Sequence, residues 1–157
     1  MSKTTRATQA LQQARVAFTV HSYEYDPNAE RIGLQAAEAM GADPNAVLKT
    51  LMVQVDGKPA CVVVPSDMEV NLKKLAAVLG GKAAQMMKPA DAERITGYHV
   101  GGISPFGQKK RMPTVIEETA FAHAEVFMNG GQRGLQVKLK PSDAAAVLDA
   151  KMAAVIG

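Results

Sequence analysis

The segment Gly97 to Arg111, GYHVGGISPFGQKKR, has the densest set of residues suited to ligand contact. Its glycines let a backbone approach a ligand closely, and successive exposed amides can bind an anion or a carbonyl oxygen. It is not a nucleotide-triphosphatase phosphate loop, because Gln108-Lys109 follows Gly107 where Lys-Ser/Thr is required after the glycine. On composition alone, a ligand-binding loop and a glycine-rich connector with a solvated basic end remain open.

A lysine interrupts an apolar run from Ala46 to Gly57, AVLKTLMVQVDG, which has the composition of a strand closing on a turn. Strand alternation places Lys49 on the face of Val47, Leu51, Val53 and Val55. One interpretation is that its stem follows this face and its charge reaches water at the strand end. The other is a partly enclosed pocket, where a polar or anionic ligand offsets the cost of desolvation.

Other residue types with catalytic potential lack the partners that their chemistry needs. The three histidines, His21, His99 and His123, have no carboxylate or cysteine at a recognised ligand spacing, so we expect no metal site. Cys61 is the single cysteine and lies in an apolar run, which favours a packing role and excludes an intramolecular disulfide. Ser104 has no nucleophile-elbow sequence around it.

The overall composition is typical of a folded domain. The chain has 157 residues, of which 47% are hydrophobic and 21% charged, so we expect one domain over residues 1–157 with a real core. A net charge of +3 permits an anionic partner without requiring one. The N-terminal residues show neither a signal peptide nor a transmembrane helix, which makes a cytoplasmic location the default expectation, with no membrane partner.

Helices and strands alternate without a regular rhythm along the chain. Helices are predicted at 4–15, 33–40, 72–80, 89–95 and 141–150. Strands are predicted at 18–26, 47–55, 60–64, 83–87, 114–117, 124–128 and 134–140. Because several strands are joined by hairpin turns, the expected fold is a single α/β domain with a mixed, largely antiparallel sheet flanked by helices.

Taken together, VLKTL from Val47, GYHVGGISPFGQKKR and the later GGQRGLQV resemble the YbaK group of free-standing aminoacyl-tRNA deacylases. These are relatives of the editing insertion domain of bacterial prolyl-tRNA synthetase, and the similarity runs from about residue 3 to the C-terminus. The resemblance implies an enzyme that hydrolyses the ester of mischarged Cys-tRNA(Pro), on a barrel-like α/β fold and without a cofactor. It implies the aminoacylated acceptor end of tRNA and prolyl-tRNA synthetase as partners.

The resemblance also assigns catalytic roles. Lys49 stands where the family keeps its pocket lysine, near the terminal adenosine of the tRNA. Gly101 to Pro105, GGISP, fits the substrate loop of the family, and the amides of Gly101 and Gly102 are expected to stabilise the oxyanion. The implied nucleophile is the thiol of the substrate cysteine, which accounts for the lack of a protein nucleophile.

Substrate selectivity is expected to depend on a set of pocket residues. Tyr23 stands where Cys-specific members have a tyrosine, whereas Ile32 replaces a phenylalanine that such members can carry. The expected substrate-binding residues are Tyr23, Ile32, Ile103, Ser104 and Pro105. The basic run Lys109-Lys110-Arg111 is a candidate for phosphate contacts with tRNA.

Three other functions remain open from the sequence. A sibling enzyme specific for Ala-tRNA(Pro) would use the same scaffold. A noncatalytic module would bind the tRNA end or the synthetase without ester turnover. A purely structural domain would keep Lys49 distant from the loop at Gly101 to Pro105.

Overall fold

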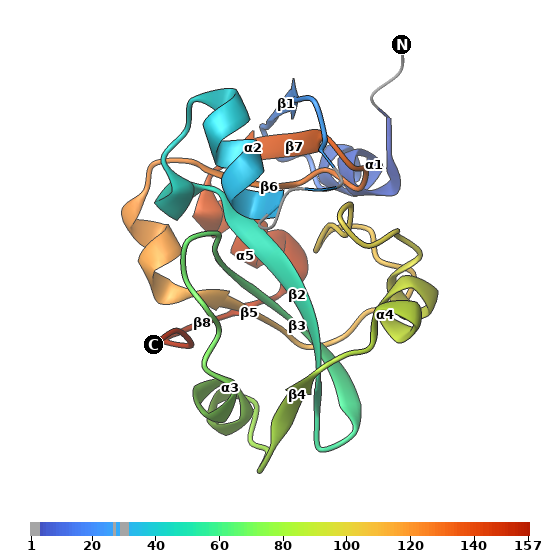
Figure 1. Ribbon diagram of the computed structural model, residues 1–157, viewed down its shortest axis with the longest axis vertical. Helices are drawn as coiled ribbons and strands as arrows, with labels where there is room; N and C mark the ends of the chain where they lie inside the picture. The colour runs from blue at the N-terminus through green and yellow to red at the C-terminus, as the bar shows by residue number, and fades with distance from the viewer. Residues whose placement is uncertain (1–3, 27, 29–31) are drawn as a thin grey trace.

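The computed structural model describes residues 4–26, 28 and 32–157, which form two sheets and their covering helices (Figure 1). The helices are α1 (Arg6–Gln13), α2 (Ile32–Met40), η1 (Pro44–Ala46), α3 (Leu72–Val78), α4 (Pro89–Thr96), η2 (Glu118–Ala122) and α5 (Pro141–Leu148). The strands are β1 (Thr19–Ser22), β2 (Leu48–Val55), β3 (Lys58–Pro65), β4 (Ala84–Met86), β5 (Thr114–Glu117), β6 (Val126–Asn129), β7 (Leu135–Leu139) and β8 (Lys151–Ala153). Within these ranges, no helix has both the length and the apolar composition that crossing a bilayer requires.

The larger sheet has the strand order β4-β2-β3-β5-β8, and the smaller one has the order β1-β7-β6. Antiparallel pairs join β1 to β7, β6 to β7, β2 to β3 and β2 to β4, whereas β3–β5 and β5–β8 are parallel. A parallel bridge between Val47 and Phe127 connects the two sheets. The sheets therefore wrap toward each other without closing, which confirms the predicted mixed, largely antiparallel and barrel-like architecture.

Local sequence signals explain most of the element ends. Asp56 and Gly57, with φ of 50° and 81°, form the two-residue turn between β2 and β3, as their tolerance of positive φ predicts. The Asn71 side chain accepts a hydrogen bond from the Lys74 amide and caps α3. Gly97 ends α4 in the left-handed conformation at φ 82°.

Three apolar clusters hold the elements together. The largest lies between the two sheets and receives buried residues from α1, α4 and α5, among them Leu11, Ala92 and Ala144. A second cluster lies on the other face of the larger sheet, under Leu75 and Ala76 of α3. A third joins α2 to Val47 and Phe127 where the sheets meet. These clusters make the larger sheet a fixed platform for the residues of β2.

The structure departs from the predicted elements in β1 and β8, and the short helices η1 and η2 were not predicted. The first predicted strand extended over residues 18–26, but β1 ends at Ser22, and its pairing continues only through a bond from the Tyr23 amide to the Gly134 carbonyl. Strand β8 was not predicted, because its three residues depend on parallel pairing with β5 rather than on a local pattern.

Candidate active site

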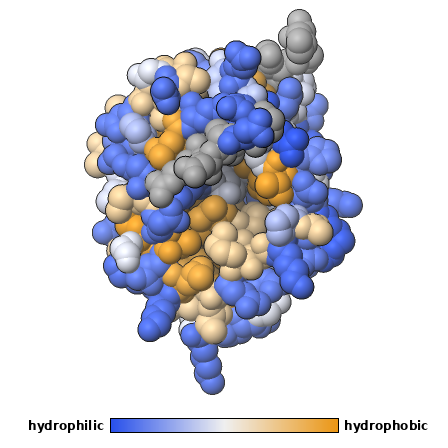
Figure 2. All heavy atoms as spheres, in the orientation of Figure 1, coloured by the Kyte–Doolittle hydropathy of each residue, from blue (hydrophilic) through white to orange (hydrophobic). Residues whose placement is uncertain are grey.

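A cavity of about 160 Å³ lies where the two sheets diverge. Strand β3 pairs with β2 along its whole length, whereas β4 covers only Val53–Val55 of the opposite edge. The uncovered start of β2 therefore faces the cavity. Its lining residues are Val47, Leu48, Lys49, Thr50, Val100, Gly101, Ile103, Asn129 and Gln136. Figure 2 shows apolar side chains gathered at the centre of the face that carries β2, with hydrophilic ones around them.

Lys49 lines this cavity at the start of β2, and its side chain is 22% exposed. Its Nζ lies 3.5 Å from Oε1 of Glu69, a side chain that is 74% exposed. The apolar residues that share its strand face, Leu51, Val53 and Val55, lie farther along β2 in the cluster under α3. The ammonium is thus at the end of the apolar face, beside a cavity and an exposed carboxylate.

The glycine loop forms one wall of this cavity, and Gly101 is part of that wall. Gly101 has a φ of +91°, and a Cβ built there would lie 2.6 Å from the Tyr25 hydroxyl. The Gly102 amide donates a hydrogen bond to the His99 carbonyl at 2.8 Å. A Cβ on Gly102 would meet the backbone nitrogen of Arg133 at 2.7 Å. Both positions therefore need glycine, Gly101 for its conformation and Gly102 for its close backbone packing.

Hydrogen bonds within the loop and one from β6 hold the loop in place. Buried Tyr98 donates its hydroxyl to the Phe106 carbonyl, and burial raises the pKa of that phenol to about 12. Gln108 donates its amide to the Ser104 carbonyl at 3.0 Å. Asn129 donates to the Gly101 carbonyl at 3.3 Å. The loop is thus tied to itself and to β6, which makes the wall of the cavity preorganised.

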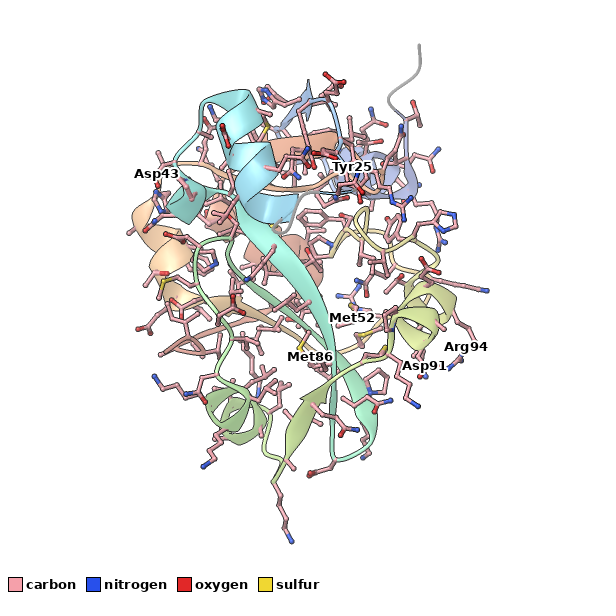
Figure 3. All side chains as sticks on the ribbon, in the orientation of Figure 1. Tyr25, Asp43, Met52, Met86, Asp91 and Arg94 are labelled. Carbon is pink, nitrogen blue, oxygen red and sulfur yellow. The ribbon has the colours of Figure 1, made fainter. Side chains whose placement is uncertain are left out.

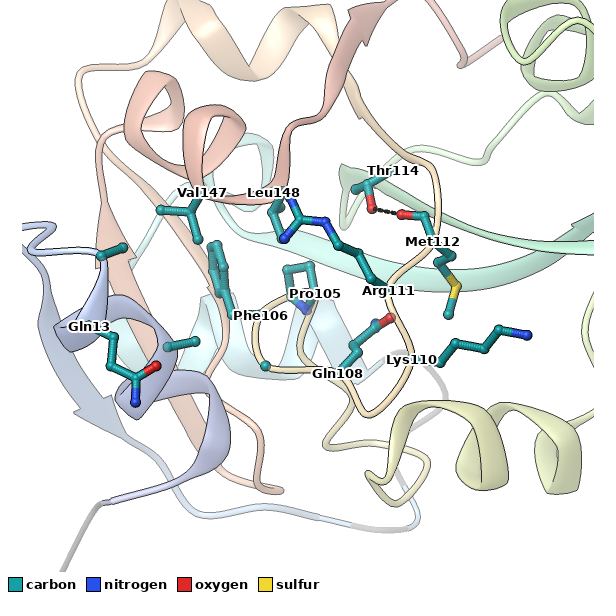
Figure 4. Close-up of a pocket in the computed structure, with 13 residues that line it drawn as sticks. Gln13, Pro105, Phe106, Gln108, Lys110, Arg111, Met112, Thr114, Val147 and Leu148 are labelled. Atoms are coloured by element: carbon teal, nitrogen blue, oxygen red, sulfur yellow. Dashed lines mark hydrogen bonds between the residues drawn. The ribbon is translucent and has the colours of Figure 1, made fainter.

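Two predicted substrate residues in this loop do not line the cavity. Ser104 is 0% exposed, and its hydroxyl accepts a hydrogen bond from the Phe106 amide at 3.1 Å. Pro105 lines a different, larger cavity of about 410 Å³ (Figure 4). Ile103 does line the Lys49 cavity. The turn at Ser104 sends the following residues to the other side of the loop, so only the first part of GGISP faces Lys49.

The larger cavity lies between α1, α5 and the segment after Pro105 (Figure 4). Lys110 and Arg111 line it, and Lys109 is exposed. The basic run therefore borders this cavity, and none of its three residues lines the cavity of Lys49. We consider the smaller cavity the better candidate for the active site, because it joins Lys49 to the glycine loop.

The smaller cavity also has polar side chains with unmet hydrogen-bonding capacity. Thr50 Oγ1 and Gln136 Oε1 are buried, and neither has a hydrogen-bond partner among the described residues. The same is true of the hydroxyl of Tyr23, a predicted substrate residue that is not among the residues lining the cavity. Burial, reinforced by Tyr25, raises the pKa of Tyr23. Buried polar atoms without partners are costly and rare, so this set indicates a site that a polar ligand completes.

Thr50, Asn129 and Gln136 are cavity residues that our sequence analysis did not identify. Asn129 and Gln136 come from β6 and β7, and their approach to Lys49 depends on how the two sheets meet. The sequence signal that could have identified them is their place in the quoted motifs, because Thr50 lies in VLKTL, Gln136 lies in GGQRGLQV and Asn129 directly precedes that motif. Ile32, a predicted pocket residue, begins α2, but its side chain lies outside the described part of the structure.

Cys61 is buried against the sheet and does not line the cavity. It is 1% exposed, and burial raises the pKa of its thiol to about 12. A thiol with this pKa is almost entirely protonated near neutral pH and is a poor nucleophile. Its position fits the packing role predicted from the apolar run.

Comparisons with known proteins show what the chain is similar to. Residues 26–147 match the aminoacyl-tRNA editing domain family. The chain is 35% identical over 140 residues to EbsC of Enterococcus faecalis, a candidate Cys-tRNA(Pro)/Cys-tRNA(Cys) deacylase, with 87% of this chain and 84% of EbsC covered. It is 25% identical over 134 residues to the multifunctional Ser/Thr-tRNA deacylase ProXp-y of Escherichia coli K12, with 85% and 80% covered.

A solved structure supports the same fold. It belongs to a candidate trans-editing enzyme for prolyl-tRNA synthetase and superposes with a TM-score of 0.82, at 22% identity. The alignment covers 97% of this chain and 95% of that one. At this level of identity the likeness concerns the fold alone.

Proposed function

The chain belongs to the aminoacyl-tRNA editing domain family, and we propose that it hydrolyses the ester of mischarged Cys-tRNA(Pro). The observation that carries the proposal is the shared cavity of Lys49 and Gly101, in which Thr50 and Gln136 present unpaired polar atoms. The similarity to EbsC supports cysteine as the amino acid.

The dimensions of the cavity suit the aminoacyl part of such a substrate. Its volume of about 160 Å³ is smaller than that of sites for drug-sized ligands, which span roughly 300–1,000 Å³. A small amino acid fits this space, whereas the nucleotides of the tRNA end must lie outside it. We assign Lys49 to the boundary between the amino acid and the nucleotides, and the exposed carboxylate 3.5 Å from its ammonium supports this assignment.

The chemistry requires orientation of the ester and stabilisation of the charge that develops on its carbonyl oxygen. We assign the oxyanion contact to the Gly101 amide, for which no acceptor is found among the described residues. The Gly102 amide, also predicted for this role, already donates to His99. Gly102 instead keeps the loop close to the turn at Arg133. Lys49 then positions the RNA end through its charge.

The nucleophile in this proposal is the thiol of the substrate cysteine. Its sulfur forms a bond to the ester carbonyl carbon, the bond from that carbon to the ribose oxygen breaks, and the ribose oxygen gains the thiol proton. Water then opens the resulting thiolactone to free cysteine. These steps use no side chain of the protein as a nucleophile, which fits the burial of Cys61 and Ser104.

A second specificity is favoured by the unpaired polar atoms themselves. Thr50 Oγ1 and Gln136 Oε1 would bond a hydroxyl as readily as a thiol or an amine. ProXp-y, the Ser/Thr-tRNA deacylase, aligns over most of this chain. Deacylation of Ser- or Thr-charged tRNA is therefore the alternative, with water in place of the substrate thiol as the nucleophile.

We further propose prolyl-tRNA synthetase as a partner. A cavity that holds only the aminoacyl end offers no means to distinguish one tRNA body from another, so selection of tRNA(Pro) needs another source. The structural relative described as a trans-editing enzyme for that synthetase supports this partner. Faster deacylation of Cys-tRNA(Pro) when the synthetase is added would support it, and an unchanged rate would oppose it.

The test of the function is a deacylation panel on tRNA(Pro) charged with cysteine, alanine, serine or proline. The proposal expects turnover of Cys-tRNA(Pro) at catalytic enzyme concentrations and much slower loss of the serine ester, because a hydroxyl is a weaker nucleophile than a thiol. Equal cysteine and serine rates would remove the thiol step. Preference for the alanine ester would indicate the sibling specificity, and tight binding without turnover would indicate a noncatalytic module.

A further inference from the structure

Arg133 is held beside the cavity loop in a way that the proposed function does not yet use. It lies in the turn between β6 and β7. Its Nε donates a hydrogen bond to the Val100 carbonyl at 2.9 Å. Its guanidinium carbon lies 5.6 Å from the centroid of the Tyr25 ring. Val100 and the adjacent Gly101 both line the Lys49 cavity, so the guanidinium is next to its wall.

These contacts fix the orientation of an exposed side chain. A Cβ on Gly101 would lie 3.3 Å from Arg133 Nε and 2.6 Å from the Tyr25 hydroxyl, so the three groups are in close packing. The turn itself is held to the segment before Tyr25, because the Tyr23 amide donates to the Gly134 carbonyl at 2.9 Å. Stacking on an aromatic ring and one hydrogen bond together restrict an otherwise flexible side chain.

The fixed guanidinium keeps most of its donors unused. Arginine has five N–H donors, and only the one on Nε has an acceptor in the part of the chain that the structure describes. No carboxylate of the described residues lies within 4.0 Å of Arg133. A planar fork with two free nitrogens matches the oxygens of a phosphate in a bidentate contact.

We propose that Arg133 binds a phosphodiester of the RNA 3′ end whose aminoacyl ester occupies the Lys49 cavity. This rests on the proposed function, since it places the ester beside Gly101. The phosphate of the terminal nucleotide is then separated from the ester by a single nucleoside, which brings it close to the loop that Arg133 contacts. Lys110 and Arg111 border the other cavity, beyond Pro105, and are less suited to this phosphate.

Two substrates that differ in phosphate content test the proposal. One is Cys-tRNA(Pro), and the other is cysteinyl-adenosine, which carries the same ester but no phosphate. Arg133→Gln should raise KM for the tRNA substrate roughly tenfold and lower the slope of log(kcat/KM) against log salt concentration by about one. Its kcat/KM on cysteinyl-adenosine should equal that of the wild type. Arg133→Lys keeps the charge but loses the planar fork, so its KM for the tRNA substrate should lie between those of the wild type and Arg133→Gln.

The matched control is Arg94→Gln. Arg94 is an arginine on α4 whose side chain is 71% exposed and pairs with Asp91 at 3.2 Å. Figure 3 shows it at the outer side of α4, away from Tyr25. This variant should behave as the wild type on both substrates. Equal losses on both substrates in Arg133→Gln would overturn the proposal, because they would show that Arg133 only braces the loop.

Failure of the proposed function has a different signature. In that case the wild type would hydrolyse neither substrate. Binding of an uncharged RNA ending in CCA would then decide the role of Arg133, with a weaker salt dependence in Arg133→Gln supporting it and identical binding curves opposing it.

Discussion

Lys49 and Gly101, which are far apart in the sequence, line the same cavity. One lies on a strand that is paired along its whole length, and the other on a loop fixed by hydrogen bonds from Asn129 and within the loop itself. This proximity argues against a purely structural domain in which the two would be distant. It also supports the proposal that strand β2 and the glycine loop form one site.

The conformation of Gly101 gives the first prediction. In Gly101→Ala, a residue at φ +91° gains a Cβ that meets the Tyr25 hydroxyl, and Tyr25 cannot move freely because Arg133 stacks on it. We expect kcat/KM for deacylation to fall at least tenfold, with a loss of stability of about 1–2 kcal/mol. Activity assays and thermal unfolding check this.

Gly80→Ala is the matched control for that loop variant. Gly80 also has a positive φ, of +73°, but a Cβ there would meet nothing within 4 Å. It should lose similar stability and keep its activity. Equal activity in the two variants would show that the shape of the loop at Gly101 is unimportant for the reaction.

The unpaired hydroxyl of Thr50 allows binding to be separated from stability. Thr50→Val removes a buried polar atom that has no partner within the described chain, so the free energy of unfolding should stay the same or rise. Deacylation should weaken, because the hydroxyl is expected to bond the substrate. Denaturant titration and steady-state kinetics measure the two effects. A variant that is less stable but fully active would contradict this reading of Thr50.

Glu117 gives a prediction on pH. Burial raises the pKa of its carboxyl, but bonds from Thr119, Val155 and Ile156 outweigh this and leave the pKa lowered. The carboxylate is 1% exposed and accepts the Thr119 amide at 2.8 Å and the Val155 amide at 2.9 Å. A lowered pKa means that Glu117 stabilises the fold above the ordinary value near 4.5 and loses this contribution as the pH falls through the folded value.

Glu117→Gln should therefore lower the free energy of unfolding by about 2 kcal/mol at neutral pH, from the loss of charge-assisted hydrogen bonds. The difference from the wild type should shrink as the pH drops below about 4.5. Glu118→Gln, at an exposed neighbour, should have little effect. Urea titrations at several pH values test this, and a gap that stays constant down to pH 3 would refute the assignment.

Local signals were sufficient to predict most of the fold. The hairpin around Asp56 and Gly57, the cap at Asn71 and the end of α4 at Gly97 depend on nearest neighbours in sequence, and all three are present. Strand β8 escaped prediction because its residues Lys151–Ala153 have no alternation of their own. It forms by pairing with β5, and the periodicity of a segment does not indicate which distant strand it pairs with.

The site was predicted only in part, for a similar reason. Strand alternation drew attention to Lys49, and composition to the glycine loop, but neither indicates how a loop turns. Ser104 faces inward because its hydroxyl bonds the Phe106 amide, and this reverses the direction of the residues after it. Gln136 reaches the cavity because the two sheets meet there, and Arg133 reaches the loop from the turn that follows β6. Both placements depend on tertiary structure.

The proposal that Lys49 and the glycine loop form one active site is tested most directly by deacylation of Cys-tRNA(Pro) by Lys49→Met under single-turnover conditions. Methionine keeps an unbranched stem and removes the ammonium beside the cavity, and Lys58→Met, at an exposed position in the distant hairpin, is the control. We predict a loss of roughly a hundredfold in rate for Lys49→Met and none for Lys58→Met. A folded Lys49→Met protein that deacylates as fast as the wild type would show that the ammonium of Lys49 takes no part in the reaction.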